Sequence, residues 1–542
     1  MKILLAQLNP IIGDLAGNAK KILDTLDAAR KKQVDIVLFS ELVLTGYPPE
    51  DLVLHKDFIG KVESYLDHII QHTKDLTVCL GLPRKSDIDK EKRLCNSVAI
   101  IQDCKLVDFY DKWLLPTYDV FDESRYFASG TQPCLFEVAG KKVAVVICED
   151  IWAESITDTQ YAKDPIETLI PYKPDLLLNL SASPYHFQKT EVRVQVCQKT
   201  ARRLSCPVLL CCQVGGNDQL LFDGYSVVVN SKAELTHLGR GFAEDFIYVD
   251  LASSSPSLPF LYDPLEDLYD ALVLGVRDYF HKSGFKKACV GLSGGIDSAL
   301  VAAIGVKALG KENVLAVALP SRYSSAGSVT DARELAKQLD IALREVSIEG
   351  PFEAFESLFF ENKHPLKGLA EENIQARIRG AILMGISNQE GCVVLSTGNK
   401  SELSVGYCTL YGDMCGGLSV IGDVTKNQVY RLAEWIHRKT GIIPRSIIEK
   451  PPSAELRPNQ KDTDSLPDYG ILDAVIEGYV EDLLSPEEIA HRTGISLSLV
   501  ENLICRIHAA EYKRRQSAPM IRVSKKALRA GRRYPIVQKW MI

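Results

Sequence analysis

The sequence has fourteen cysteines in 542 residues but no C-x-x-C pair. Without such pairs a zinc ribbon is excluded. The thiols are scattered along the chain, with Cys211 and Cys212 adjacent, which does not fit the usual disulfide framework of a secreted protein. We therefore expect reduced thiols and a cytoplasmic location.

Long apolar runs are also missing. The longest uncharged apolar stretches, such as residues 299–306, are far too short to cross a bilayer. The first apolar run is interrupted by Gln7, Asn9 and Pro10 before a signal-peptide core could form, so it predicts a first strand. We expect no membrane segment and no membrane partner.

The chain has no excess of positive charge, since its formal net charge is −7. Such a chain has no general attraction for nucleic acid, and only local basic patches could bind it. Residues 511–533 form one such patch, and residues 484–516 resemble a helix-turn-helix with Gly494 at the turn. Nucleic-acid binding is therefore kept as the alternative function, although we expect no nucleic-acid partner.

The composition, with 46% hydrophobic and 25% charged residues, is that of a globular protein. The length predicts about two to four domains. Short β-rich runs alternate with helical patterns before and after a stretch rich in serine and proline at residues 251–264. This alternation predicts two α/β domains, residues 1–255 and 265–542, joined by a linker at residues 256–264.

Strand-helix units after the linker predict an open, doubly wound parallel sheet. In one of these units the run "SVTDARELAKQL" opens at Ser328 like a capping box, which predicts the start of a helix there. After residue 470 the pattern becomes mainly helical. The second domain should therefore end in a helical extension.

One cysteine stands out by its position. Cys148 directly follows the apolar run 143–147, and Glu41 follows another such run, so both should lie at carboxyl ends of buried strands. A nucleophilic thiol needs a base for its proton and a cation for the charge that develops. Glu41 and Lys112 are candidates for these roles. The alternative is that Cys148 is one more buried, unreactive thiol.

Three segments, "SELVLTGYPPEDL", "DKWLLPTYDVFDE" and "VAVVICEDIW", occur in that order. Together they resemble the glutamine amidase domains of the nitrilase superfamily, which have an αββα sandwich fold. The resemblance implies that Glu41 is the general base, that Lys112 stabilises the charged intermediate, and that Cys148 attacks the carboxamide of glutamine. It also implies three glutamine-binding residues, namely Tyr118, Ser183 and Lys189.

Two further positions are judged from the same resemblance. His186 lies between two of the expected glutamine-binding residues, and we interpret it as structural rather than as a catalytic base. Gln219 stands where the family commonly has an acidic residue. An electrostatic role at that position is therefore not expected in this chain.

A glycine-rich segment, "SGGIDS", follows an apolar strand at residues 293–298. It lacks the lysine of a Walker loop, so phosphates would be held by backbone amides and by the positive end of the helix that starts near Ser298. Asp297 suggests a magnesium ion. The alternative is an ordinary turn between a strand and a helix.

The loop resembles that of the ATP pyrophosphatases, which cleave ATP between its α and β phosphates. The segments "LPSRYSSAGS", "EENIQARIRG", "LSTGNKSELSVGY", "YGDMCGG" and "DVTKNQVYRLA" are similar to those of NAD synthetases. An amidase domain ahead of them is typical of the glutamine-dependent members. The resemblance implies ATP-dependent amidation of deamido-NAD through an adenylated intermediate, with glutamine or ammonia as nitrogen donor. It also implies a homo-oligomer.

Site residues of the ligase domain follow from the resemblance, motif by motif. Those expected to bind ATP are Gly291, Leu292, Ser293, Gly294, Gly295, Ile296, Asp297, Ser298, Thr397 and Lys426. Those expected to bind deamido-NAD are Asn373, Arg377, Glu402, Asp413 and Lys513. Asp297 and Glu402 are the expected magnesium ligands, so the implied cofactors are Mg²⁺ and, as co-substrate, ATP.

Overall fold

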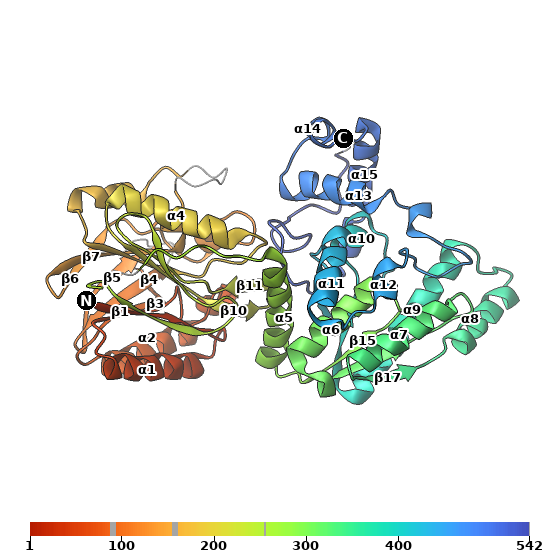
Figure 1. Ribbon diagram of the computed structural model, residues 1–542, viewed down its shortest axis with the longest axis horizontal. Helices are drawn as coiled ribbons and strands as arrows, with labels where there is room; N and C mark the ends of the chain where they lie inside the picture. Colours follow the sequence, from red (N-terminus) through yellow and green to blue (C-terminus); the bar gives the residue numbers. More distant parts are fainter. Residues whose placement is uncertain (87–93, 154–160, 254–255, 541–542) are drawn as a thin grey trace. The chain divides into compact units, whose positions relative to one another are not determined.

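A computed structural model gives the fold, and it describes residues 1–86, 94–153, 161–253 and 256–540. The chain divides into two compact units, Met1–Asp263 and Pro264–Ile542 (Figure 1). In the described residues no helix is long and apolar enough to cross a membrane. All fourteen cysteines are free thiols.

The first unit contains two six-stranded sheets. One has the order β14 (Asp245–Asp250), β1 (Lys2–Gln7), β2 (Ile36–Leu38), β3 (Thr77–Lys85), β4 (Leu94–Gln102) and β5 (Lys105–Asp111). The other has the order β13 (Leu235–Leu238), β12 (Val227–Val229), β9 (Val208–Cys212), β8 (Leu176–Ser181), β7 (Lys141–Ile147) and β6 (Cys134–Val138). A short hairpin, β10 (Val214–Asn217) and β11 (Leu220–Asp223), stands apart from them.

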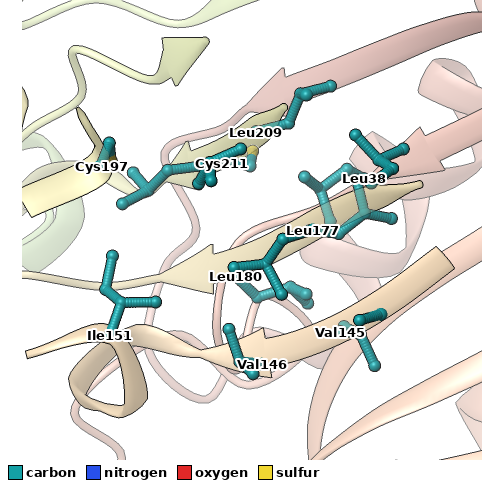
Figure 2. Close-up of a cluster of buried hydrophobic side chains, with 14 of the residues drawn as sticks. Leu38, Val145, Val146, Ile151, Leu177, Leu180, Cys197, Leu209 and Cys211 are labelled. Atoms are coloured by element: carbon teal, nitrogen blue, oxygen red, sulfur yellow. The ribbon is translucent and has the colours of Figure 1, made fainter. Parts of the chain in front are cut away.

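Successive side chains of β1 point to opposite faces of its sheet, and this alternation explains how the layers of the first unit are arranged. Ile3 and Leu5 belong to the core between the sheets, whereas Leu4 and Ala6 pack with α1 (Leu15–Lys31) and α2 (Lys56–Ile70). Figure 2 shows Leu38 of the first sheet beside Leu177 of the second. On the far side of the second sheet lie α3 (Pro165–Leu169) and α4 (Lys189–Leu204). The predicted αββα sandwich is confirmed.

The second unit contains one parallel sheet, in the order β17 (Ala342–Glu345), β16 (Val314–Ala318), β15 (Lys287–Gly291), β18 (Cys392–Ser396) and β19 (Leu418–Ser419). From β15 the chain continues to β16 and β17 on one side of that strand, and it then crosses to β18 on the other side of β15. The carboxyl ends of β15 and β18 therefore flank the switch point at which such sheets bind ligands.

Helices cover both faces of this sheet, as predicted. One group consists of α5 (Pro264–Ser283), α6 (Ile296–Leu309) and α11 (Lys426–Thr440). The other consists of α8 (Glu349–Glu361) and α9 (Leu369–Glu390), which contact each other, whereas α7 (Ala326–Gln338) contacts β16 and β17. The predicted start of α7 was wrong: its N-cap is Ser325, whose hydroxyl accepts from the Ser328 amide, so the helix begins two residues before Ser328.

The helical extension is formed by α13 (Tyr469–Ile476), a π-helical turn (Glu477–Glu481), α14 (Pro486–Thr493), α15 (Leu497–Ala509) and α16 (Glu511–Arg514). Its apolar core also includes Leu403 and Val405 of the short helix α10 (Lys400–Val405). The extension therefore fixes α10, which begins next to β18 and the ligand-binding edge of the sheet. A further short helix, α12 (Arg445–Glu449), follows α11.

Candidate active sites

Cys148 lies directly after β7, at the first position of a short 3-10 turn, Cys148–Ile151. Its φ of +42° is uncommon for a residue with a side chain, and such strained positions are frequent at functional sites. The residue is only 4% exposed. Its sulfur accepts a hydrogen bond from the Ser181 hydroxyl, with an O–S distance of 3.3 Å.

Two buried carboxylates share the ammonium group of Lys112 beside this thiol. Lys112 Nζ lies 2.7 Å from Glu41 Oε1 and 2.7 Å from Glu123 Oε1. Asn96 Nδ2 also donates to Glu41 Oε1, and the amide of Ala182 donates to Glu41 Oε2. Both carboxylate oxygens of Glu41 are thus held by donors that lie far from Glu41 in the sequence.

The charges of this cluster determine which groups ionise. Burial works against the ammonium form of Lys112, but Glu123 and Glu41 outweigh it and raise the pKa of this amine. Burial and, next, Glu41 raise the pKa of the Cys148 thiol, while Lys112 opposes the rise. A thiol with a raised pKa needs a base in contact range to become a nucleophile. The structure brings the predicted Glu41, Lys112 and Cys148 together.

Sequence reasoning did not single out Glu123, although it is the last residue of the segment "DKWLLPTYDVFDE". Burial raises the pKa of Glu123 to about 7; Lys112 opposes this rise and Glu41 adds to it. The hydroxyl of Tyr47 donates to the same carboxylate at 2.8 Å. Glu123 is therefore a second acidic group of the site.

Expected glutamine-binding residues surround the thiol turn. Tyr118 donates its hydroxyl to Glu149 Oε1 at 2.9 Å, and Glu149 directly follows the nucleophile candidate. Ser183 is buried next to the end of β8. Lys189 begins α4, donates to the carbonyl of Pro184 at 2.8 Å and lies over the Trp152 ring.

The two remaining positions of this unit have plain structural settings. His186 Nδ1 lies 3.0 Å from the carbonyl oxygen of Phe187. Gln219 lies between β10 and β11, and its buried Oε1 has no hydrogen-bond partner in the parts of the chain that the structure describes.

In the second unit the glycine loop joins β15 to α6 at the switch point. Gly294 has a φ of +75°, and a Cβ there would come within 2.2 Å of the carbonyl oxygen of Ser328. Only glycine fits this position. The amides of Ser293 and Gly295 donate to the Ser298 and Ser293 hydroxyls within the turn. The helix begins at Ile296, two residues earlier than expected.

A cavity of about 320 Å³ opens over this loop. Its walls include the end of β15 with the glycine loop and the start of α6, and five residues from elsewhere in the unit. The first group is Gly291, Leu292, Ser293, Gly294, Gly295, Ile296, Asp297 and Ser298, and the second is Ser328, Thr397, Glu402, Asp413 and Lys426. All predicted ATP-binding residues therefore line one cavity, together with two of the five predicted for deamido-NAD.

Asp297 and Glu402 share the ammonium group of one lysine, an arrangement like that of the two carboxylates around Lys112 in the first unit. Lys426 Nζ lies 2.5 Å from Asp297 Oδ2 and 3.3 Å from Glu402 Oε1, and Asn399 donates to Asp297 Oδ1 at 3.0 Å. Burial raises the pKa of Glu402 to about 7, against the effect of Lys426. Asp462, which the sequence did not indicate, lines the same cavity.

The donor chemistry fits the expected magnesium ion, which binds through one or two carboxylates plus substrate phosphates. Asp297 and Glu402 supply two carboxylates on one wall, held close enough to share a single ammonium group. Within the described residues, no cluster of three or more His, Cys, Asp or Glu side chains is arranged to hold a metal by itself.

Three predicted residues are absent from the cavity wall within the described part of the chain, and each of them hydrogen-bonds a residue of the segment 406–410. Asn373 Oδ1 accepts from the hydroxyl of Thr409, a wall residue, at 2.6 Å. Arg377 donates to the carbonyl of Leu410 at 3.2 Å. Lys513 donates to the carbonyls of Gly406 and Cys408, each at 2.7 Å.

The basic patch of the C-terminal extension has internal partners. Arg514 is buried and donates to the carbonyl oxygens of Leu403 and Ser404. Arg532 pairs with Glu511 at 2.5 Å. Although α14 and α15 meet at Gly494 as in a helix-turn-helix, these cations stabilise the extension itself.

A thiol site on an αββα sandwich and a glycine cradle on a doubly wound sheet define a class of protein, an amidase joined to an ATP-dependent ligase. Two family models match accordingly: "Carbon-nitrogen hydrolase" over residues 2–256 and "NAD synthase" over residues 268–517.

Full-length relatives name the family. A glutamine-dependent NAD(+) synthetase of Synechocystis is 45% identical over 99% of this chain and 98% of the relative, and one of Thermotoga maritima is 40% identical over 100% and 99%. The solved structure of such an enzyme from Acinetobacter baumannii, in complex with adenosine diphosphate, has 37% identity and a TM-score of 0.77, covering 99% of this chain and 98% of that one. The chain belongs to the glutamine-dependent NAD(+) synthetases.

Proposed function

We propose that the chain converts deamido-NAD to NAD with ATP, using ammonia that its first unit releases from L-glutamine. The products are NAD, AMP, pyrophosphate and glutamate. The observation that carries this proposal is the presence of two chemically different sites in one chain, the Glu41–Lys112–Cys148 cluster and the glycine cradle with its cavity. We assign the first reaction to residues 1–255 and the second to residues 265–542.

In the glutaminase step, Glu41 takes the proton of Cys148, and the sulfur bonds to the carboxamide carbon of glutamine. The carbon–nitrogen bond then breaks, and the nitrogen leaves as ammonia with the proton that Glu41 returns. Water hydrolyses the thioester to glutamate and the free thiol. Lys112 stabilises the oxyanion of each addition, because its ammonium group lies beside the reacting atoms. Tyr118, Ser183 and Lys189 hold the substrate.

In the ligase step, a carboxylate oxygen of deamido-NAD attacks the α-phosphorus of ATP and pyrophosphate leaves. Ammonia then displaces AMP from the adenylated carboxyl group. Amides of residues 291–298, with Thr397 and Lys426, hold the phosphates. Magnesium bound to Asp297 and Glu402 would neutralise phosphate charge.

Deamido-NAD itself is assigned to Asn373, Arg377, Glu402, Asp413 and Lys513. Of these, Glu402 and Asp413 face the cavity, and the other three support the adjoining wall. We further propose that the protein is a homo-oligomer, which the family resemblance supports. We also propose that it is cytoplasmic, which the fourteen free thiols support.

Cys148→Ala tests the division between the two sites. The variant should lose glutamine hydrolysis and glutamine-driven NAD synthesis but keep most of its synthesis from ammonium salts, because the thiol acts only in nitrogen release. Its ammonium-driven rate should rise with pH across the neutral range, as more ammonium becomes free ammonia. Steady-state assays with each nitrogen donor measure both effects.

The wild-type chain with ammonium serves as the control for folding and for the ligase site. If Cys148→Ala retained glutamine-driven synthesis, Cys148 would be an ordinary core thiol and the first assignment would fail. If a folded variant lost synthesis from ammonia as well, the division of labour would be wrong.

A further inference from the structure

The end of β8 lies directly beside the nucleophile. Strands β7 and β8 are parallel neighbours, and Ile147 pairs with Leu180 at the last position of their register. The next residues along the two strands are Cys148 and Ser181. Because carboxyl ends of neighbouring parallel strands meet at one edge, these two side chains are brought together by the register of the sheet.

The Ser181 hydroxyl is in direct contact with the sulfur, donating to it at 3.3 Å. Ser181 is 1% exposed and Cys148 is 4% exposed, so water has little access to this pair. Among the described residues, Ser181 is the one side chain that hydrogen-bonds the sulfur. Lys112 directs its ammonium group to the carboxylates of Glu41 and Glu123 instead.

A buried thiolate without a hydrogen bond is a costly species. When the thiol proton passes to Glu41, the negative charge stays on a sulfur whose side-chain hydrogen bond, within the described residues, comes from Ser181, because Lys112 donates to Glu41 and Glu123. A hydroxyl already aimed at this atom meets the charge without any rearrangement, and hydrogen bonds to charged groups are stronger than those to neutral ones.

We propose that Ser181 is a further catalytic residue of the glutaminase site, whose hydroxyl donates a hydrogen bond to the Cys148 thiolate. This inference rests on the proposed glutaminase function and adds a group to it. The thiol loses its proton to Glu41 as before, and the Ser181 proton stays on its oxygen throughout.

The experiment compares Ser181→Ala with Ser226→Ala in the full-length chain. Ser226 is a matched control, because it is a fully buried serine of the same unit whose hydroxyl accepts from the Cys212 amide and donates to Gln7. Ser181→Ala should lower kcat for glutamine hydrolysis roughly 10- to 100-fold. NAD synthesis from ammonium should be unchanged in both variants.

A second readout separates catalysis from packing. Alkylation of Cys148 by iodoacetamide, followed by mass spectrometry of its peptide, reports the apparent pKa of this thiol. Ser181→Ala should move the alkylation profile to higher pH by about one unit, and Ser226→Ala should not. Ser181→Thr keeps the hydroxyl and should retain the wild-type profile.

Each failure has a distinct meaning. Absence of glutaminase activity in the wild type would overturn the proposed function, whereas an active wild type with an equally active Ser181→Ala variant would overturn only the role of Ser181. An unshifted alkylation profile in Ser181→Ala, or an equal loss of activity in Ser226→Ala, would also refute it.

Discussion

Lys112 has a buried amine between two buried acids, Glu41 and Glu123, with only one positive charge for the two potential negative charges. Burial, together with the nearby carboxylate of Glu41, raises the pKa of Glu123 to about 7. A proton held by Glu123 is therefore available in a site that must first remove and later return a proton.

This arrangement makes stability depend on pH in a defined direction. The pKa of Glu123 is raised from its ordinary value of 4.5 to about 7, chiefly by burial. A carboxyl group that binds its proton more tightly when folded contributes full stability below pH 4.5, and this contribution is lost as the pH rises toward 7.

Glu123→Gln should therefore lose less thermal stability than the wild type as the pH rises through this window, because a neutral amide of similar volume does not titrate. Melting curves of both proteins, followed by circular dichroism across the same pH series, measure the difference. A variant whose melting temperature falls as steeply as that of the wild type would show that Glu123 does not titrate there.

At the scale of elements, the glycine turn between β15 and α6 depends on backbone shape. Gly294 combines a left-handed φ of +75° with close approach to the backbone of Ser328 in α7. A side chain would push α7 and the loop apart, and displacements of about 1 Å can lower catalytic rates roughly 100-fold.

Gly294→Ala should accordingly lose NAD synthesis from glutamine and from ammonium alike, while glutamine hydrolysis in the first unit continues. Gly327→Ala is the matched control, since a Cβ at Gly327 would meet no atom closer than 3.8 Å. Steady-state assays with both nitrogen donors distinguish the variants. Retention of ligase activity in Gly294→Ala would show that the cradle does not need this shape.

Elements differed in how well the sequence predicted them. The apolar runs of β7 and β15 were recognised because these strands lie inside their sheets and their apolar side chains are buried on both faces. The edge strands β5 and β17 were not, because most of their residues are exposed and their apolar pattern is weak.

On the scale of the whole molecule, each unit has a core and a ligand-binding edge of its own. The proposed reactions require this, because one site must release a nucleophile and the other must prepare an electrophile. A free carboxylate is a poor target for ammonia, so activation by ATP is the chemical reason for the second unit.

Adenylation leaves an isotopic trace. With oxygen-18 in the carboxylate of deamido-NAD, label should appear in AMP, and pyrophosphate should be the other product, whichever nitrogen donor is used. Mass spectrometry of the nucleotide products measures this. Formation of ADP and phosphate, or unlabelled AMP, would contradict attack of the carboxylate on the α-phosphorus.

Local chemistry was enough to locate the reactive groups from the sequence. A thiol directly after an apolar run, and serine, glycine and aspartate between a strand and a helix, are contiguous patterns whose meaning depends on neighbours in the chain. For this reason Cys148, the residues of the cradle and the two α/β domains could be recognised, and family resemblance assigned the roles of Glu41 and Lys112.

Only the tertiary structure could reveal how distant groups share charge and hydrogen bonds. Lys112 and Glu41 are 71 positions apart and Lys426 and Asp297 are 129 apart, yet each pair is in contact through folding. Glu123 and Ser181 lie within recognised segments, but their roles depend on burial and on strand register, which no local pattern specifies. The physical reason is that Coulomb interactions and desolvation act through space, so a pKa depends on neighbours that only the folded chain assembles.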